Sequence, residues 1–326
     1  MEEYSSIISN SNIINLISKI HEYKGKQSYL LDTKKDTLET LLKVAKIQST
    51  SSSNKIEGIY TTDKRINEIV NQKLEPKNRN EEEIAGYRDV LTLIHENYNF
   101  IDINQNTILQ LHRDLYKYTG YSYGGKFKNS QNFIEEENEK GEKKIRFTPL
   151  SPVETPIAIE ELCKNYNELV NNESCDLLVL IPIFILDFVS IHPFNDGNGR
   201  MSRLLTLLLL YKVNYMVGKY ISIEKIIEET KDSYYDALEK SSLNWHNNEN
   251  DYSYFVDDNP TKFVSTDDVR AFSGFSSVSE EVAASTQEVT ATIGEQVSVI
   301  DVLKDEVEAL RADAKTLGES IDRFKV

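Results

Sequence analysis

Cysteine is scarce in this sequence, which has only Cys163 and Cys175 among its 326 residues. Neither lies in a CxxC pair or in a cluster with histidine, which argues against a disulfide scaffold and against a structural zinc site. The first residues also lack the positive start and the apolar run of a secretory signal. We therefore expect a protein of the reducing cytoplasm.

Basic residues are outnumbered, with 37 lysines and arginines against 53 aspartates and glutamates and a net charge of -16. Binding along a nucleic-acid backbone needs a basic stripe, and none stands out in the sequence. We expect no nucleic-acid partner. This charge is still compatible with a local site for an anion.

Long apolar runs are missing as well. The most apolar stretch, residues 177–191, contains Pro182 and Asp187 and is too short to span a bilayer. It predicts a helix that is buried on all sides, and we expect no membrane span. Apolar residues make up 39% of the chain, which is enough for a sizeable core.

Apolar residues recur at helical spacing along most of residues 36–162, and the period continues after them. It predicts further helices over 157–170, 176–191, 199–213 and 223–243. The exception is the segment 121–149, where Gly124-Gly125 and a polar turn at 138–141 favour a β-hairpin. The sequence predicts an all-α fold with a small β-hairpin flap.

The composition changes near the C-terminus. Residues 257–274 have no sustained period and predict a junction, whereas residues 275–326 follow a heptad repeat that predicts a long coiled-coil helix. One helix cannot bury such a seam alone, so we expect a homo-oligomer formed through this tail. The two seam positions are Val282, Val289, Gln296, Leu303, Leu310, Leu317 and Phe324, and Thr286, Ile293, Ile300, Val307, Ala314 and Ile321.

One segment, residues 191–203, concentrates groups suited to phosphate chemistry and reads IHPFNDGNGRMSR. Gly197 and Gly199 allow the backbone to approach an anion closely, and the helix that starts here directs free N–H groups at it. Arg200 and Arg203 are three residues apart, so both can lie near the start of this helix and hold phosphate oxygens.

Two further residues of the segment have chemical uses. Asp196 is an oxygen ligand suited to Mg²⁺ that is also held by the phosphates of a nucleotide. His192 lies at the end of the preceding helix, where it can act as a general base. Each residue alone has a plainer explanation as a helix cap or a surface side chain, but together they favour a functional site.

The segment resembles the signature of the Fic family, in which His-Pro-Phe, two variable positions, Gly-Asn-Gly-Arg and a second arginine three residues later recur. Every fixed position is present. The resemblance extends over about residues 35–255. It implies a Fic domain at 1–256 that transfers AMP from ATP to a Ser, Thr or Tyr hydroxyl of a target protein, which can be the protein itself.

The resemblance also implies roles for individual residues. His192 removes the proton from the target hydroxyl, Asp196 holds Mg²⁺, and the hairpin aligns the target by strand addition. The branch of the superfamily that phosphorylates its targets usually has lysine at the position of Gly199. Glycine at this position therefore favours AMP transfer. The implied phosphate cradle consists of Gly197, Asn198, Gly199, Arg200 and Arg203.

The pair Tyr234 and Tyr235 has two interpretations. The tyrosines can line the pocket for the adenine base, or they can belong to the core, which is the commoner fate of an aromatic pair on a helix. The sequence leaves both open.

A second motif lies upstream, at residues 53–58, which read SNKIEG. Ser53 and Glu57 are one helical turn apart, and Gly58 is a natural end for a helix. The motif resembles the inhibitory motif of the Fic family. This resemblance implies a helix near 45–58 whose Glu57 pairs with Arg203 and occupies the space of the ATP γ-phosphate.

Residues 275–326 resemble the C-terminal helix of methyl-accepting chemotaxis receptors, and a generic oligomerisation coiled coil is an equal alternative. The hairpin tip and the partner helix of those receptors are missing from the sequence. Two other functions therefore stay open. One is a catalytically silent coiled-coil signalling or scaffold fusion, and the other is a deAMPylase or another phosphate-ester transfer at the same site.

Overall fold

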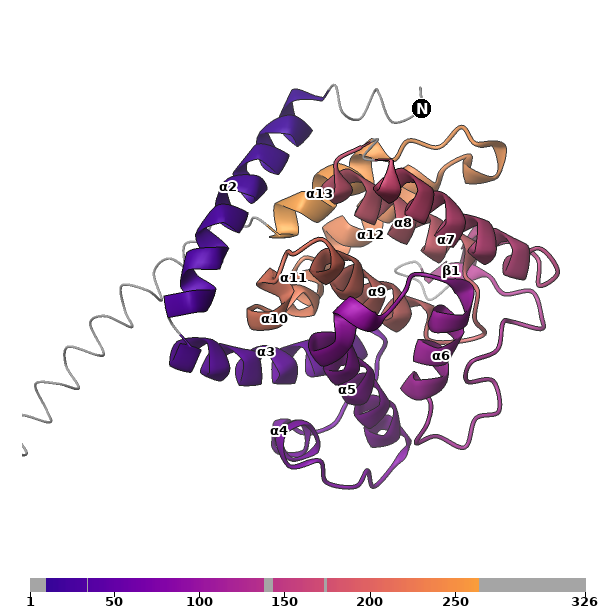
Figure 1. The fold of residues 1–326 in the computed structure, drawn as a ribbon. Coiled ribbons are helices and arrows are strands. Elements are labelled where there is room, and N and C mark those ends of the chain that lie inside the picture. Colours follow the sequence, from indigo (N-terminus) through magenta and orange to yellow (C-terminus); the bar gives the residue numbers. More distant parts are fainter. Residues whose placement is uncertain (1–9, 34, 138–142, 173–174, 264–326) are drawn as a thin grey trace, which may run out of the picture. The chain divides into compact units, whose positions relative to one another are not determined.

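The computed structural model describes residues 10–33, 35–137, 143–172 and 175–263. They form a mostly helical fold with one small antiparallel sheet, which confirms the predicted class (Figure 1). The predicted coiled coil lies outside the described residues. The longer helices are α2 (Ser11–Thr33), α3 (Lys35–Ile56), α4 (Asp63–Gln72), α5 (Arg79–Asn97), α6 (Gln105–Leu115), α7 (Thr155–Asn171), α8 (Leu177–Ile191), α9 (Asn198–Lys212), α12 (Lys231–Ser242) and α13 (Ser253–Phe263).

The short elements complete the described fold. They are the helices α10 (Val217–Tyr220) and α11 (Ile223–Glu229), the single turns η1 (Tyr98–Phe100) and η2 (Trp245–Asn247), and the strands β1 (Ile134–Glu137) and β2 (Lys143–Phe147). None of the described helices is both long and apolar enough to cross a membrane.

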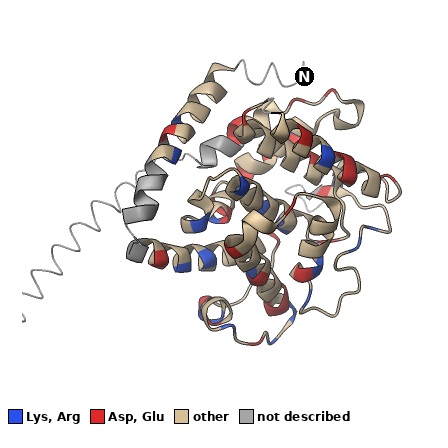
Figure 2. Cartoon of the chain, in the orientation of Figure 1, with Lys and Arg blue, Asp and Glu red and all other residues tan. Residues whose placement is uncertain are grey.

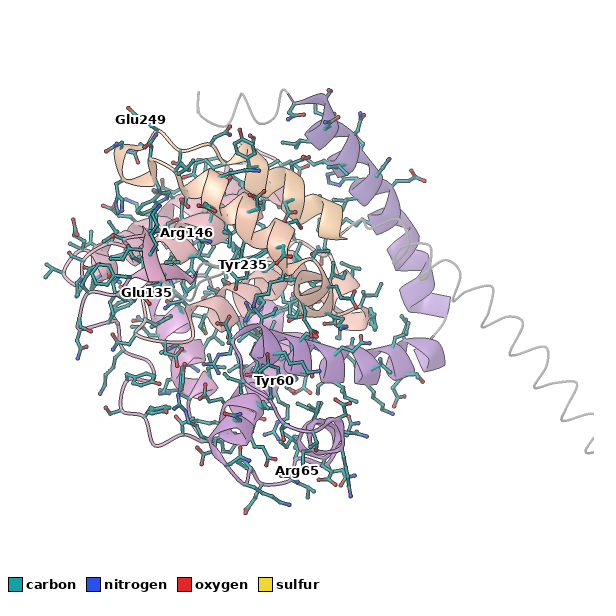
Figure 3. The ribbon with its side chains drawn as sticks, turned by 180° about the vertical axis from the view of Figure 1, so that it is seen from behind. Tyr60, Arg65, Glu135, Arg146, Tyr235 and Glu249 are labelled. Carbon is teal, nitrogen blue, oxygen red and sulfur yellow. The ribbon has the colours of Figure 1, made fainter. Side chains whose placement is uncertain are left out.

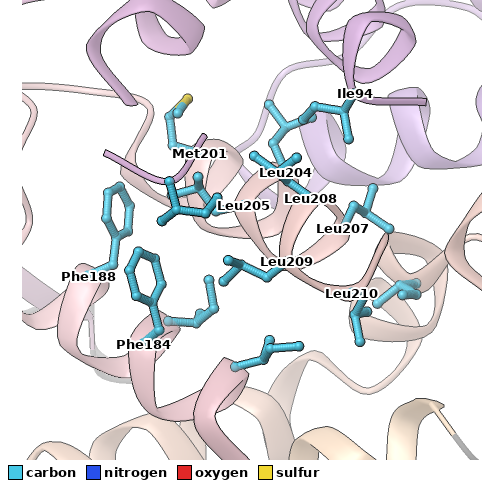
Figure 4. Close-up of a cluster of buried hydrophobic side chains, with 14 of the residues drawn as sticks. Ile94, Phe184, Phe188, Met201, Leu204, Leu205, Leu207, Leu208, Leu209 and Leu210 are labelled. Atoms are coloured by element: carbon cyan, nitrogen blue, oxygen red, sulfur yellow. The ribbon is translucent and has the colours of Figure 1, made fainter. Parts of the chain in front are cut away.

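The helices α8 and α9 form the centre of the core (Figure 4). Nearly every side chain of α8 is buried, as its strongly apolar sequence predicts. The leucines of α9 from Leu204 to Leu210 are also buried, and they pack with Phe184 and Phe188 of α8. The segment 191–203 therefore lies on the connection between these two buried helices, which fixes both ends of its loop.

The outer helices carry the charge. Figure 2 shows acidic and basic residues interspersed along α3. This helix packs against α4, α5, α10 and α11. The C-terminal end of α3 thereby reaches the start of α9.

The hairpin forms as predicted, although its strands occupy only the second half of the segment 121–149. Ile134 pairs with Phe147 and Glu135 with Ile145, with an irregularity between Ile134 and Glu135. The predicted turn at 138–141 lies outside the described residues.

Three predicted boundaries differ from the structure. The single helix predicted over 223–243 is wrong, because the backbone turns at Thr230 and separates α11 from α12. The helix α2 was not predicted; it is held by Ile13, which packs with Val179 and Val256 in a tertiary contact that the local sequence does not show.

The third difference concerns the start of the predicted junction. The helix α13 continues through residues 257–263, so the first part of the predicted junction is helical. Phe255 and Val256 are buried in its first turn and fix the start of the helix. Polar residues then extend the helix without an apolar period, which is why periodicity did not reveal it.

Candidate functional site

The motif loop is held in an unusual backbone conformation. The helix α8 ends at Ile191, and His192 follows with a φ of 51°, in the left-handed region. Gly197 has a φ of 82°, and α9 begins at Asn198. A non-glycine residue in this region costs roughly 1–3 kcal/mol and persists only where its surroundings hold it.

Asn198 holds this loop through its side chain. Its Oδ1 accepts a hydrogen bond from the backbone N–H of Phe194 at 2.9 Å, and its Nδ2 donates to the carbonyl of Phe194 at 2.8 Å. The side chain of Asn198 therefore stabilises the loop. The phosphate contact that the resemblance implies for Asn198 stays a prediction.

The ring of His192 is half-buried, and its Nδ1 lies 3.3 Å from the carbonyl oxygen of Val189. Because a carbonyl only accepts, Nδ1 carries the proton in this contact and Nε2 is the unprotonated nitrogen. The pKa of His192 is lowered to about 4, chiefly by burial and also by Lys128, against the opposing effects of the hydrogen bond to Val189 and of the Glu57 and Asp196 carboxylates. The imidazole is neutral at pH 7 and can accept a proton.

Asp196 is accessible, with its side chain 48% exposed, and it is not among the residues that line the pocket described below. Its Oδ1 accepts a hydrogen bond from the N–H of Gly197 at 2.7 Å. Among the described residues, no three His, Cys, Asp or Glu side chains gather as a metal site. A single accessible carboxylate fits Mg²⁺ only when phosphate oxygens and water supply the other ligands.

The residues of the predicted inhibitory motif meet Arg203 at the start of α9. Arg203 is 2% exposed and donates from Nε to Ser53 Oγ at 2.8 Å, and from Nη2 to the Ser53 carbonyl at 2.9 Å and to Glu57 Oε1 at 2.7 Å. Gly58, with a φ of 75°, follows directly where the chain leaves α3. These contacts join residues about 150 positions apart in the sequence.

Gly199 allows Glu57 to approach the first turn of α9. A Cβ atom at position 199 would lie 2.3 Å from Glu57 Oε1 and 3.3 Å from Arg203 Nη1. Glycine thus leaves room for an anionic group directly over this turn, and in the structure that group is the carboxylate of Glu57.

The two arginines of the motif do not lie on the same rim. Arg200 is 1% exposed; its Nη1 lies 2.8 Å from Glu83 Oε2, and its Nη2 donates to the hydroxyl of Tyr116 at 2.6 Å. Its Nη2 is 3.9 Å from Asp196. Arg200 is thus engaged by buried partners on α5 and at the end of α6, and the expectation that Arg200 and Arg203 hold one anion together stays a prediction.

A pocket lies beside these groups, between the hairpin, α8, α9 and α12. Tyr234 and Tyr235 line it, and both also pack as an aromatic pair with ring centroids 5.6 Å apart. The tyrosines thus line the pocket and also pack against each other, and the binding of an adenine base there stays a prediction. The polar lining consists of Glu57, Arg146, Ser190, His192, Asn198, Ser202, Arg203 and Ser242. A larger pocket, lined by Tyr166 and Trp245, contains none of the predicted site residues.

Arg146 and Ser190 belong to the pocket although the sequence did not single them out. Arg146 comes from β2 and lies near Tyr235 of α12 (Figure 3). Within the described part of the chain, Arg146 Nε and Ser190 Oγ are buried and lack a hydrogen-bond partner. Buried polar atoms without partners are costly, so a polar ligand in the pocket would satisfy them.

His112 supports the loop from α6. Its ring stacks on Phe194 with centroids 3.6 Å apart, its Nδ1 accepts from the N–H of Gly125, and its Nε2 lies 3.0 Å from the carbonyl oxygen of Asp196. Burial lowers its pKa to about 4. An isolated histidine on a helix gives no sequence signal for such a contact.

Part of the chain is similar to a known protein family. Residues 102–210 match the model of the Fic/DOC family. The protein described as "Protein adenylyltransferase Fic" from Aedes aegypti is 29% identical over 168 residues, which are 51% of this chain and 28% of that protein. The match therefore spans less than a third of that relative's length.

Solved structures show a similar fold. A Fic family protein from Desulfovibrio desulfuricans G20 matches with a TM-score of 0.63 and 21% identity, over 79% of this chain and 75% of that one. A Fic domain containing signaling protein from Bacteroides thetaiotaomicron VPI-5482 matches with a TM-score of 0.61 and 23% identity, over 77% and 93%. At these identities the likeness establishes the fold alone.

Proposed function

We propose, from the premise that residues 102–210 form a Fic domain, that this chain is a protein adenylyltransferase inhibited by its own Glu57. The substrates are ATP and a Ser, Thr or Tyr hydroxyl of a target protein. The observation that carries the proposal is the contact of Ser53 and Glu57 with Arg203, over the first turn of α9 in the pocket that His192 also lines.

The transfer forms one bond to phosphorus and breaks another. Nε2 of His192 takes the proton of the target hydroxyl, the hydroxyl oxygen attacks the α-phosphorus of ATP, and pyrophosphate leaves with the electron pair of the broken P–O bond. The unprotonated Nε2 and the neutral ring suit this step. The start of α9 supplies backbone N–H groups and Arg203 supplies positive charge for the phosphates.

Mg²⁺ would be held by Asp196 together with the nucleotide's phosphates, and it supplies charge neutralisation there. The Asp196 carboxylate is exposed and can reach a bound ion, which fits this role. Tyr234 and Tyr235 provide an apolar wall for the base.

Inhibition follows from the same geometry. Arg203 is occupied by Ser53 and Glu57, so it is not available to a phosphate. The Glu57 carboxylate would also repel an anionic phosphate in a site where little water screens the charges. ATP can then bind only in a pose that keeps its terminal phosphate away from Arg203.

The decisive experiment compares wild type with Glu57→Gly in the presence of ATP labelled at the α-phosphate. We expect Glu57→Gly to incorporate at least tenfold more label into itself or into proteins of a lysate, because Arg203 is freed. Adding Arg203→Ala to this variant should reduce incorporation again. Glu57→Gln is the matched control, since it keeps the size of the side chain but removes its charge, and it should give an intermediate rate.

Other outcomes identify the alternatives. Incorporation of a γ-phosphate label in place of the α-label would indicate phosphate transfer. Release of AMP from a previously modified target, without net incorporation, would indicate a deAMPylase. Unchanged, negligible incorporation in Glu57→Gly would contradict both inhibition by Glu57 and the transferase itself, and would favour a silent scaffold.

A further inference from the structure

Four consecutive carbonyl groups of the motif loop accept hydrogen bonds from one short segment, residues 128–132. The side chain of Lys128 donates from Nζ to Ile191 at 3.1 Å, and its backbone N–H donates to Pro193 at 2.9 Å. Asn132 donates from Nδ2 to His192 at 3.3 Å and to Phe194 at 3.0 Å. We call these contacts the carbonyl clamp.

The two side chains of the clamp also bind each other. Lys128 Nζ donates to Asn132 Oδ1 at 2.9 Å, so the amide is oriented with its donors toward the loop. Lys128 is only 2% exposed. A lysine is rarely buried to this extent, and its described hydrogen-bond acceptors are carbonyl oxygens. The negative end of the α8 dipole lies here, which favours a cation at this place.

The clamp surrounds His192, a residue of the motif loop with an unfavourable backbone conformation. His192 has a positive φ of 51° without being glycine. The clamp binds its own carbonyl and the carbonyls on both sides of it. Contacts of this kind are what keeps a strained residue in a single conformation.

The charge of Lys128 also acts on the imidazole. The charged groups that affect His192 are Lys128, Glu57 and Asp196. Lys128 disfavours the imidazolium, whereas the two carboxylates favour it. Removal of the lysine charge should therefore shift the equilibrium of His192 toward the protonated form.

We propose that Lys128 and Asn132 are positioning residues, which hold His192 in its left-handed conformation and orient its ring for proton transfer. This inference rests on the proposed function only for the rate measurements below. Asn132 lies two residues before the start of β1, so the clamp also joins the hairpin to the motif loop. A target that binds along the hairpin would therefore be linked through Asn132 to the position of His192.

The test uses the full chain carrying Glu57→Gly, with Lys128→Met added. Methionine preserves the apolar stem but removes the charge and the donors. We expect the rate constant of AMP transfer to fall about 100-fold, the size associated with a displacement of about 1 Å of a catalytic group. The KM for ATP should stay within about threefold. Lys128→Arg should recover part of the rate, and Lys164→Met, at an exposed lysine of α7, should change nothing.

A second measurement does not depend on activity. The pKa of His192, followed by NMR of labelled imidazole in the otherwise unchanged chain, should rise in Lys128→Met and stay low in Lys128→Arg. A folded Lys128→Met protein with an unchanged rate and an unchanged His192 pKa would overturn the proposal. If Glu57→Gly proves inactive, the proposed function fails while the NMR result still decides the clamp.

A third variant covers the case in which Lys128→Met does not fold. Asn132→Asp keeps the acceptor for Lys128 but removes both donors to the loop. We expect a rate at least tenfold lower in the Glu57→Gly chain, with the melting temperature little changed. A folded Asn132→Asp protein with the parent rate would likewise overturn the role of the clamp.

Discussion

At the scale of the residue, the motif divides into side chains that face the pocket and side chains that hold the loop. His192 and Arg203 face the pocket, whereas the amide of Asn198 binds the backbone of Phe194 and Arg200 pairs with Glu83. The sequence indicates that these residue types gather around phosphate chemistry. It does not indicate where each side chain points, because the partners come from helices far away in the chain.

Replacement of His192 by alanine separates catalysis from binding. In the Glu57→Gly chain, we expect His192→Ala to lower AMP transfer at least 100-fold, since a general base contributes about 10²–10⁴ to a rate. The dissociation constant for ATP, measured by calorimetry, should stay within about threefold because the ring does not hold a phosphate. His246→Ala, at an exposed histidine on η2, is the control and should leave the rate unchanged. A parallel loss of ATP affinity would argue against a role as base.

At the scale of the element, periodicity predicted the helices that bury a continuous apolar surface. The predicted segments 157–170 and 176–191 agree with α7 and α8 within two residues at either end. The break at Thr230 was not predictable from the period, because the apolar spacing continues across it. The helix α2 was not predicted either, because it depends on tertiary contacts of Ile13.

The helix α3, which ends one residue before Glu57, is held by polar contacts to α11. Ser49 bonds to Ser222, and Ser52 donates to Glu228 Oε2 at 2.5 Å, although both serines are buried. Polar contacts replace much of the apolar packing at this end of α3. We infer that displacement of this end relieves inhibition, since Glu57 follows directly.

Ser52→Ala tests this inference. Loss of a hydrogen bond to a charged group costs roughly 1.5–3 kcal/mol. If displacement of α3 breaks this bond, its loss raises the displaced fraction about tenfold, since 1.4 kcal/mol corresponds to a factor of ten. We expect self-modification in the wild-type background to rise several-fold, but less than in Glu57→Gly. Glu39→Ala removes an exposed pair with Lys43 on the same helix and should have no effect. Equal rates in Ser52→Ala and wild type would contradict this role for the α3–α11 contact.

At the scale of the whole molecule, the match to the Fic/DOC family covers residues 102–210, and Glu57, which contacts Arg203, lies outside that range. Glu57 follows α3, and the packing of α3 on α5, α9 and α11 brings it to Arg203. The two halves of the proposed switch are thus joined by tertiary structure. The sequence could suggest the pairing by resemblance, but only the arrangement of helices brings the two residues to 2.7 Å.

The last prediction concerns the C-terminal tail, residues 275–326, which lies outside the described residues. Its heptad seam is almost entirely apolar in sequence, and a single helix would expose that seam to water. Pairing between chains is favoured over folding back, because the heptads run unbroken and Gln296 at a seam position helps to set one register. We expect the intact protein to be at least dimeric by light scattering at micromolar concentration. Deletion after Phe275 should give a monomer, or a smaller oligomer if residues 1–275 associate with themselves, whereas a monomeric intact chain would contradict pairing through the tail.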